Sequence, residues 1–133
     1  MKAKKIYHIE LQCVFAERWR YNIELIAASF DEQGEQTGYH TTTSRIADSG
    51  AELKCPPEGV EIATHLSLET APCHKAELLV YFIPHTLPAD NEIEATAPVQ
   101  CPLVVRAEGR EVCHHSIEVN GWGGASFRTT IEG

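Results

Sequence analysis

The chain has 133 residues, of which 43% are hydrophobic and 23% are charged, and its formal net charge at pH 7 is −8. The composition is that of a folded globular protein rather than a disordered chain, and the length suits one domain, spanning residues 1–133, with one core. An acidic chain without a dense basic cluster is a poor ligand for nucleic acid or for an anionic membrane, so we expect neither partner.

The amino-terminal lysines at positions 2, 4 and 5 lead directly into an alternating stretch, and no apolar signal region follows them. No stretch approaches the ~20 consecutive apolar residues that a membrane-spanning helix needs. These two features predict a cytoplasmic location.

Apolar and polar residues alternate over several stretches, as in strands with one buried face. Residues 5–15 and 19–27 show this period, and a turn between them predicts one long hairpin over 5–30, which ends at 31–34. The alternation breaks near its end, where Ile26 and Phe30 stand in the other phase, so either a bulge or a second covered face is required. Further strands are expected at 39–46 (a weak edge strand), 60–68, 76–83, 92–97, 103–107, 111–119 and 127–131.

Turn residues separate these strands every 8–12 residues or so, and a helical period persists nowhere. The turn at 108–110 predicts a second hairpin, and Asn120-Gly121 is the strongest short hairpin signal in the chain. The sequence therefore predicts an all-β protein, a two-sheet antiparallel β-sandwich of about eight or nine strands.

The most apolar stretch is residues 76–84, Ala-Glu-Leu-Leu-Val-Tyr-Phe-Ile-Pro. A short run of this kind, closed by Pro84, predicts a strand that is covered on both faces. One of its two faces must point away from the sandwich core. We assign the outer face to Leu79, Tyr81 and Ile83, because Glu77 shares their phase and Tyr81 tolerates a wet edge.

Three large apolar side chains on an outer face form a patch that soluble monomers generally avoid exposing. Two covers are open at this stage, the loop 84–91 of the same chain or a second protein chain. The interface hypothesis places Leu79, Tyr81 and Ile83 in contact with a protein partner or with another copy in a homodimer.

The five cysteines are odd in number and no two are spaced as C-x-x-C, so we expect reduced thiols and no pair joined in a disulfide. One set could still carry chemistry: Cys73, His74, Cys113 and His115 offer four ligands to zinc, or a thiol and a base for a hydrolase. The spacing is atypical for zinc and no thiol-hydrolase signature is present. We therefore expect no stoichiometric metal and no cofactor.

The leading interpretation is a non-enzymatic module that binds protein. It is favoured because the sequence lacks a nucleotide-binding loop, a nucleophile motif and paired carboxylates with a clear role. Two alternatives stay open: a zinc-binding protein or hydrolase that uses the Cys/His set, and a module that binds carbohydrate or another small ligand through Trp19, Trp122 and the tyrosines.

Overall fold

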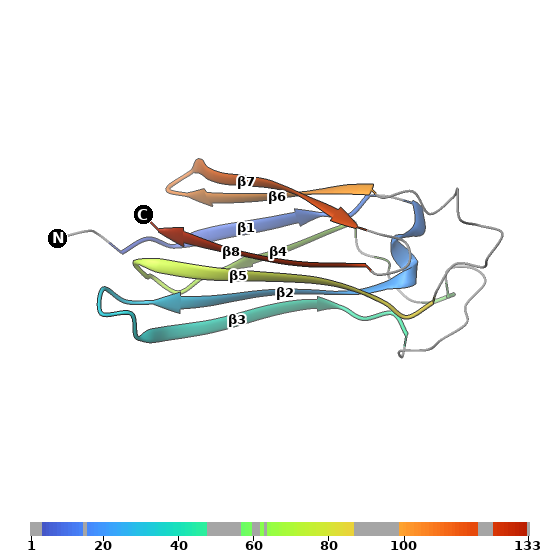
Figure 1. Cartoon of the computed structure of the whole chain (residues 1–133), viewed down its shortest axis with the longest axis horizontal. Helices are drawn as coiled ribbons and strands as arrows, with labels where there is room; N and C mark the ends of the chain where they lie inside the picture. Colours follow the sequence, from blue (N-terminus) through green and yellow to red (C-terminus); the bar gives the residue numbers. More distant parts are fainter. Residues whose placement is uncertain are drawn as a thin grey trace.

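The computed structural model describes residues 4–14, 16–47, 57–59, 62, 64–86, 99–119 and 124–132. Within these residues, eight strands form two four-stranded antiparallel sheets, which face each other as the two layers of a β-sandwich (Figure 1). This confirms the predicted fold class. The elements are β1 (Tyr7–Gln12), a short 3-10 helix η1 (Ala16–Arg20), β2 (Tyr21–Phe30), β3 (Gln36–Ser44), β4 (His65–Glu69), β5 (Lys75–Pro84), β6 (Val99–Ala107), β7 (Arg110–Val119) and β8 (Ala125–Glu132).

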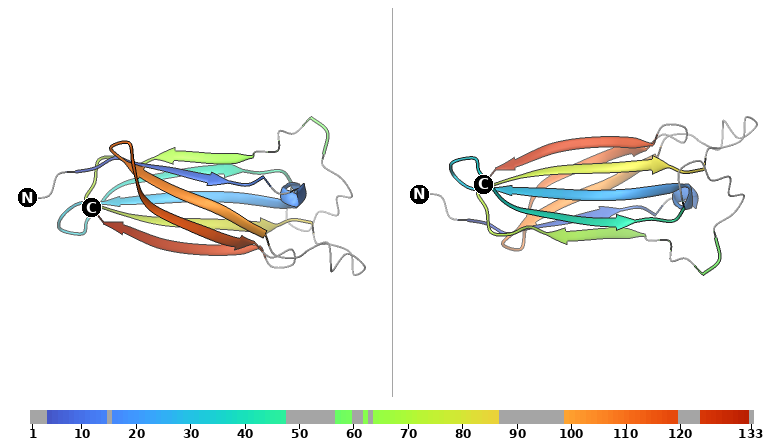
Figure 2. Two further views of the ribbon diagram at one scale, coloured as in Figure 1. Left: turned by 90° about the horizontal axis from the view of Figure 1, so that it is seen from above. Right: turned by 90° about the horizontal axis from the view of Figure 1, so that it is seen from below.

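The first sheet has the strand order β4-β1-β6-β7, and the second sheet has the order β3-β2-β5-β8. Figure 2 shows the first sheet in front on its left and the second sheet in front on its right. Each sheet therefore has one inner face toward the other sheet and one outer face. β5, which contains the apolar run, is a central strand of the second sheet, between β2 and β8.

Alternate side chains of the two sheets fill the space between them, because successive residues of a strand point to opposite faces. The inner side chains of β5 are Ala76, Leu78, Val80 and Phe82, and each is at most 1% exposed. This confirms the inner set expected from the sequence. The inner side chains of its neighbours and of the first sheet are buried in the same way: Tyr7, Ile9, Leu11, Ile23, Leu25, Ala27, Leu103 and Val105.

The predicted hairpin over 5–30 is wrong. β1 pairs with β4 and β6 in the first sheet, whereas β2 pairs with β3 and β5 in the second. Between them, the chain passes through η1, so the two alternating stretches end in different layers. Trp19, which the alternation placed on the strand, lies in η1 and is 6% exposed. Alternation specifies a strand and its buried face, but it does not specify the partner strand.

The phase break in β2 needs no bulge toward β5, because the β2–β5 register runs without a shift from Tyr21 to Phe30. Ile26 and Phe30 instead point to the outer face, and the register shift at Ser29/Phe30 concerns only the pairing with β3. β3 lies at the edge of the second sheet, as expected for the Thr-rich stretch.

The hairpin of β6 and β7 is confirmed, with Glu108 and Gly109 in its two-residue turn. Both turn residues have positive φ, as the tightest hairpin turns require. The strand expected at 92–97 and the Asn120-Gly121 turn lie outside the described residues. In the described part of the chain, no helix is long and apolar enough to cross a membrane.

A buried histidine joins the end of β5 to η1. The His85 ring is 2% exposed, its Nε2 lies 2.7 Å from the carbonyl oxygen of Trp19, and its Nδ1 lies 2.8 Å from Oγ1 of Thr86. The carbonyl can only accept, so Nε2 donates to it and the Thr86 hydroxyl donates to Nδ1 of the neutral ring. Burial lowers the pKa of His85, and the hydrogen bond to Trp19 opposes this to a smaller extent.

Candidate functional site

The outer face of the second sheet carries a cluster of large apolar side chains at its centre. Leu79, Tyr81 and Ile83 follow one another along β5 on this face, and Ile26 of β2 lies directly across from Leu79 in the register. Ile83 is 39% exposed, and the other three are half-buried. We call these four side chains, Ile26, Leu79, Tyr81 and Ile83, the apolar stripe. The structure places the three predicted interface residues together on an outer face.

Polar side chains surround the stripe on both sides. Tyr81 lies between Glu24 of β2 and Ser126 of β8, and Leu79 has Arg128 of β8 on its other side. The guanidinium of Arg128 forms an ion pair with Glu77, with 2.8 Å between Nη2 and Oε1. Beyond β2, the outward side chains of β3 are two threonines and an exposed tyrosine: Thr43, Thr41 and Tyr39. An apolar centre with a polar rim is the usual anatomy of a protein interface.

The outer face of the first sheet is built differently. Its central strands β1 and β6 present Glu10 and Arg106, which form an ion pair at 3.1 Å. Between β1 and the edge strand β4, His8 pairs with Glu69 at 3.3 Å. Ser116 donates a hydrogen bond to Gln100 at 2.8 Å on the same face. The two outer faces thus differ in polarity. An antiparallel sheet with one solvated face is expected to look like the outer face of the first sheet.

The loop 84–91 was one of the two covers considered for the stripe. Its first residues turn into the end of the sandwich, where His85 and Thr86 are buried beside η1. Residues 87–91 lie outside the described chain, so this cover is not tested.

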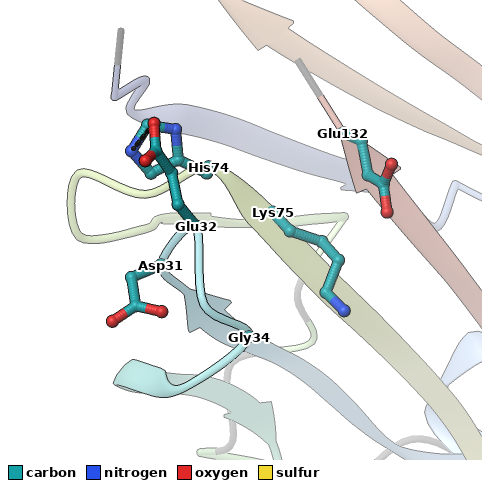
Figure 3. A pocket seen from close by; sticks show the side chains of 6 residues that line it. All are labelled: Asp31, Glu32, Gly34, His74, Lys75 and Glu132. Atoms are coloured by element: carbon teal, nitrogen blue, oxygen red, sulfur yellow. Dashed lines mark ion pairs between the residues drawn. The ribbon is translucent and has the colours of Figure 1, made fainter. Parts of the chain in front are cut away.

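An open pocket of about 330 Å³ lies at the other end of the second sheet, where the β2–β3 turn meets the start of β5 and the end of β8 (Figure 3). The alternating sequence gave no signal for it, because turn residues such as Asp31 and Gly34 are ordinary in hairpins. Its lining residues are Asp31, Glu32, Gly34, His74, Lys75 and Glu132.

Several polar groups of this pocket have partners within the chain, but Nδ1 of His74 is buried without a hydrogen-bond partner. Oδ1 of Asp31 accepts hydrogen bonds from the backbone N–H groups of Gln33 and Glu35, at 2.9 Å each, and so holds the turn. Nε2 of His74 lies 3.6 Å from Oε1 of Glu32.

The two remaining charged residues lie toward β5 and β8. The Lys75 ammonium lies 5.0 Å from the centre of the Phe30 ring. Figure 3 shows Asp31 and Glu132 on opposite sides of the pocket, so the carboxylates do not converge. Asp31 and Glu132 therefore do not form a carboxylate pair, and His74 and Glu32 are 3.6 Å apart, beyond hydrogen-bond distance.

The structure does not bring the predicted Cys/His set together. His74 faces Glu32 at the pocket, whereas the His115 ring contacts Phe127 on the far edge of the sandwich, with 5.0 Å between the ring centres and 55° between the ring planes. Sγ of Cys73 is buried and lies 3.7 Å from the carbonyl oxygen of Lys5. Within the described residues, no three His, Cys, Asp or Glu side chains are grouped as a metal site requires. The zinc alternative therefore gains no support from the geometry.

The described thiols are free and are placed for packing rather than for catalysis. Cys13 and Cys101 are at most 1% exposed, and burial raises the pKa of Cys13 to about 12 and that of Cys101 to about 11. Burial, with a contribution from Glu111, also raises the pKa of the half-buried Cys113. A catalytic thiol needs the opposite shift.

The aromatic residues proposed for a carbohydrate site are mostly buried. Trp19, Tyr7 and Tyr21 belong to the core or its end, and the guanidinium of Arg20 lies 4.7 Å above the Trp19 ring. Trp122 lies outside the described residues. The tyrosines on the outer surface, Tyr39 and Tyr81, both belong to the outer face of the second sheet.

No family model and no curated protein matches this chain. Two solved structures resemble it. One is the domain of unknown function DUF4425 from Bacteroides vulgatus, with a TM-score of 0.60 and 10% identity over 100% of this chain and 98% of that chain. The other is a DUF4425 family protein from Bacteroides ovatus, with a TM-score of 0.55 and 10% identity over 96% and 94% of the two chains. At this identity the likeness shows the fold alone.

Proposed function

We propose that this protein is a non-enzymatic binding module that contacts another protein through the outer face of its second sheet. The observation that carries the proposal is the apolar stripe of four neighbouring side chains on two central strands of one outer face, whereas the central strands of the first sheet present the charged pair Glu10 and Arg106 beside Val104 and Pro102. Apolar groups clustered at the centre of a polar rim mark protein-binding surfaces, whereas single apolar residues on a surface do not.

The pocket supports a rival small-ligand role less well. Its acidic and basic groups do not converge, and Asp31 and Glu32 already have partners within the chain. Small-ligand sites are usually concave and mainly apolar, with a few polar groups that converge on the ligand.

The test compares variants on the two outer faces. Leu79→Glu puts a carboxylate in the stripe, and Val104→Glu is the matched control. Val104 is also a half-buried aliphatic residue on the outer face of a central strand, but in the first sheet, across from Glu10. Both variants should keep the far-ultraviolet spectrum and the cooperative melting of the native protein.

Each protein is immobilised and exposed to an extract of the cells from which it comes. A bound protein that is retained by the native chain and by Val104→Glu, but lost with Leu79→Glu, supports the proposal. If every bound protein survives Leu79→Glu, the stripe is not the binding surface and the proposal fails.

A further inference from the structure

We propose that the partner of the apolar stripe is a second copy of this chain, related to the first by a two-fold axis that runs parallel to the strands between β2 and β5. This inference rests on the proposed function and adds the identity of the partner. The register of the second sheet carries it, because the register fixes which outward side chains lie in one row across the four strands.

Three central rows lie along the outer face. The first contains Thr43, Glu24, Tyr81 and Ser126, the second contains Thr41, Ile26, Leu79 and Arg128, and the third contains Tyr39, Ala28, Glu77 and Thr130. A two-fold axis parallel to the strands sets each row of one copy opposite the same row of the other copy. It places β5 of one copy over β2 of the other, and β8 over β3, as in aligned packing of two sheets.

This superposition pairs chemically matched groups in two of the rows. In the central row, Leu79 of each copy meets Ile26 of the other, so these two stripe residues cover each other, whereas Ile83 meets Asn22 of the other copy. In the next row, Tyr81 meets Glu24, and the phenolic hydroxyl can donate a hydrogen bond to the carboxylate. Each of these contacts occurs twice, because a two-fold interface is self-complementary.

The charged rim also suits this axis. Arg128 faces Thr41 of the other copy, Glu77 faces Ala28, and the next row sets Glu132 near Gln36. No two charges of the same sign meet in these rows. A two-fold axis across the strands at the Leu79 row would instead place Arg128 against Arg128.

The net charge and size of the face are compatible with self-association. The face carries three carboxylates and two cations, Glu24, Glu77, Glu132, Lys75 and Arg128, although the whole chain carries a charge of −8. Four strands spaced about 4.8 Å apart and about eight residues long cover about 500 Å² per copy. Two copies then bury about 1,000 Å², which is near the lower limit of specific interfaces. The expected dimer is reversible and forms in the micromolar range.

Sedimentation velocity of the full chain from about 1 μM to about 500 μM measures this equilibrium directly. The native protein and Val104→Glu should pass from monomer to dimer with similar midpoints, and Leu79→Glu should weaken the dimer by at least about tenfold. A native chain that stays monomeric throughout would overturn the inference. The extract experiment still decides the proposed function in that case.

A mixture of two variants tests the two-fold arrangement itself. Tyr81→Glu places a carboxylate against Glu24 of the other copy, so this variant should be monomeric. Glu24→Lys alone should dimerise weakly. Mixed in equal amounts, they should form a heterodimer, because the new carboxylate at position 81 then meets the new ammonium at position 24 of the other chain.

This rescue acts only between chains, so changes of stability within one chain do not imitate it. A native dimer that resists Leu79→Glu, or a mixture that yields no heterodimer, would contradict the proposed arrangement.

Discussion

Replacing Gly124 by alanine should strongly destabilise the sandwich. Gly124 precedes β8 with a φ of +70°, which alanine adopts at a cost of about 1 kcal/mol. A Cβ at this position would also overlap the backbone carbonyl oxygen of Phe82 and lie 2.9 Å from Cδ of Pro84. Both neighbours belong to β5, whose pairing with β8 would have to shift. Overpacking of this kind costs roughly 1–3 kcal/mol.

The matched control is Gly34→Ala in the β2–β3 turn. Gly34 has a similar φ of +81°, but a Cβ there would meet nothing within 4 Å. The control therefore carries only the backbone cost, about 1 kcal/mol, whereas Gly124→Ala should lose about 3 kcal/mol in total.

Urea unfolding measures both losses, with the fluorescence of the two tryptophans, Trp19 and Trp122, as one signal and equal slopes required for the comparison. If both variants lose the same stability, β5 does not pack against Gly124 as described, and the placement of β8 is wrong.

Three further predictions follow from buried and titratable groups. Because burial lowers the pKa of His85, the folded state binds fewer protons than the unfolded state. The free energy of unfolding should therefore fall as the pH drops through about 6.5, and it should fall less steeply in His85→Gln. An equal dependence of the free energy of unfolding on pH in the two proteins would contradict this. At pH 8, iodoacetamide should modify the native protein at Cys113 well before Cys13 and Cys101, because the thiols of Cys13 and Cys101 are buried and hold their protons. In urea without reductant, iodoacetamide should modify all five cysteines, and fewer than five modified cysteines would reveal a disulfide. Elemental analysis should find well below one zinc per chain, and a full equivalent that is lost with Cys113→Ser would restore the zinc alternative.

The strand pattern of this protein was largely predictable, because each strand carries its buried face as a period of two. The two faces of β5 follow from the same rule, so the outer position of Leu79, Tyr81 and Ile83 could be inferred before the structure. The odd phase of Ile26 was visible as well. Its meaning required the register, since only the pairing of β2 with β5 shows that Ile26 lies beside Leu79.

The layer assignment could not be inferred in the same way. β1 and β2 follow each other closely and both alternate, yet they belong to different sheets because η1 redirects the chain. Local alternation carries no information about such long-range pairing. The pocket at the β2–β3 turn also had no signal, because its lining residues His74, Glu32 and Glu132 belong to three segments that are distant in sequence.

The central claim, that the outer face of the second sheet binds a second copy of this chain, is tested most directly by a dilution series followed by methyl NMR. Concentrating the protein should shift the methyl signals of Leu79, Ile26 and Ile83, while those of Val104 and Val112 on the first sheet stay fixed. If the signals of the first sheet move and those of the stripe do not, the binding surface has been assigned to the wrong face.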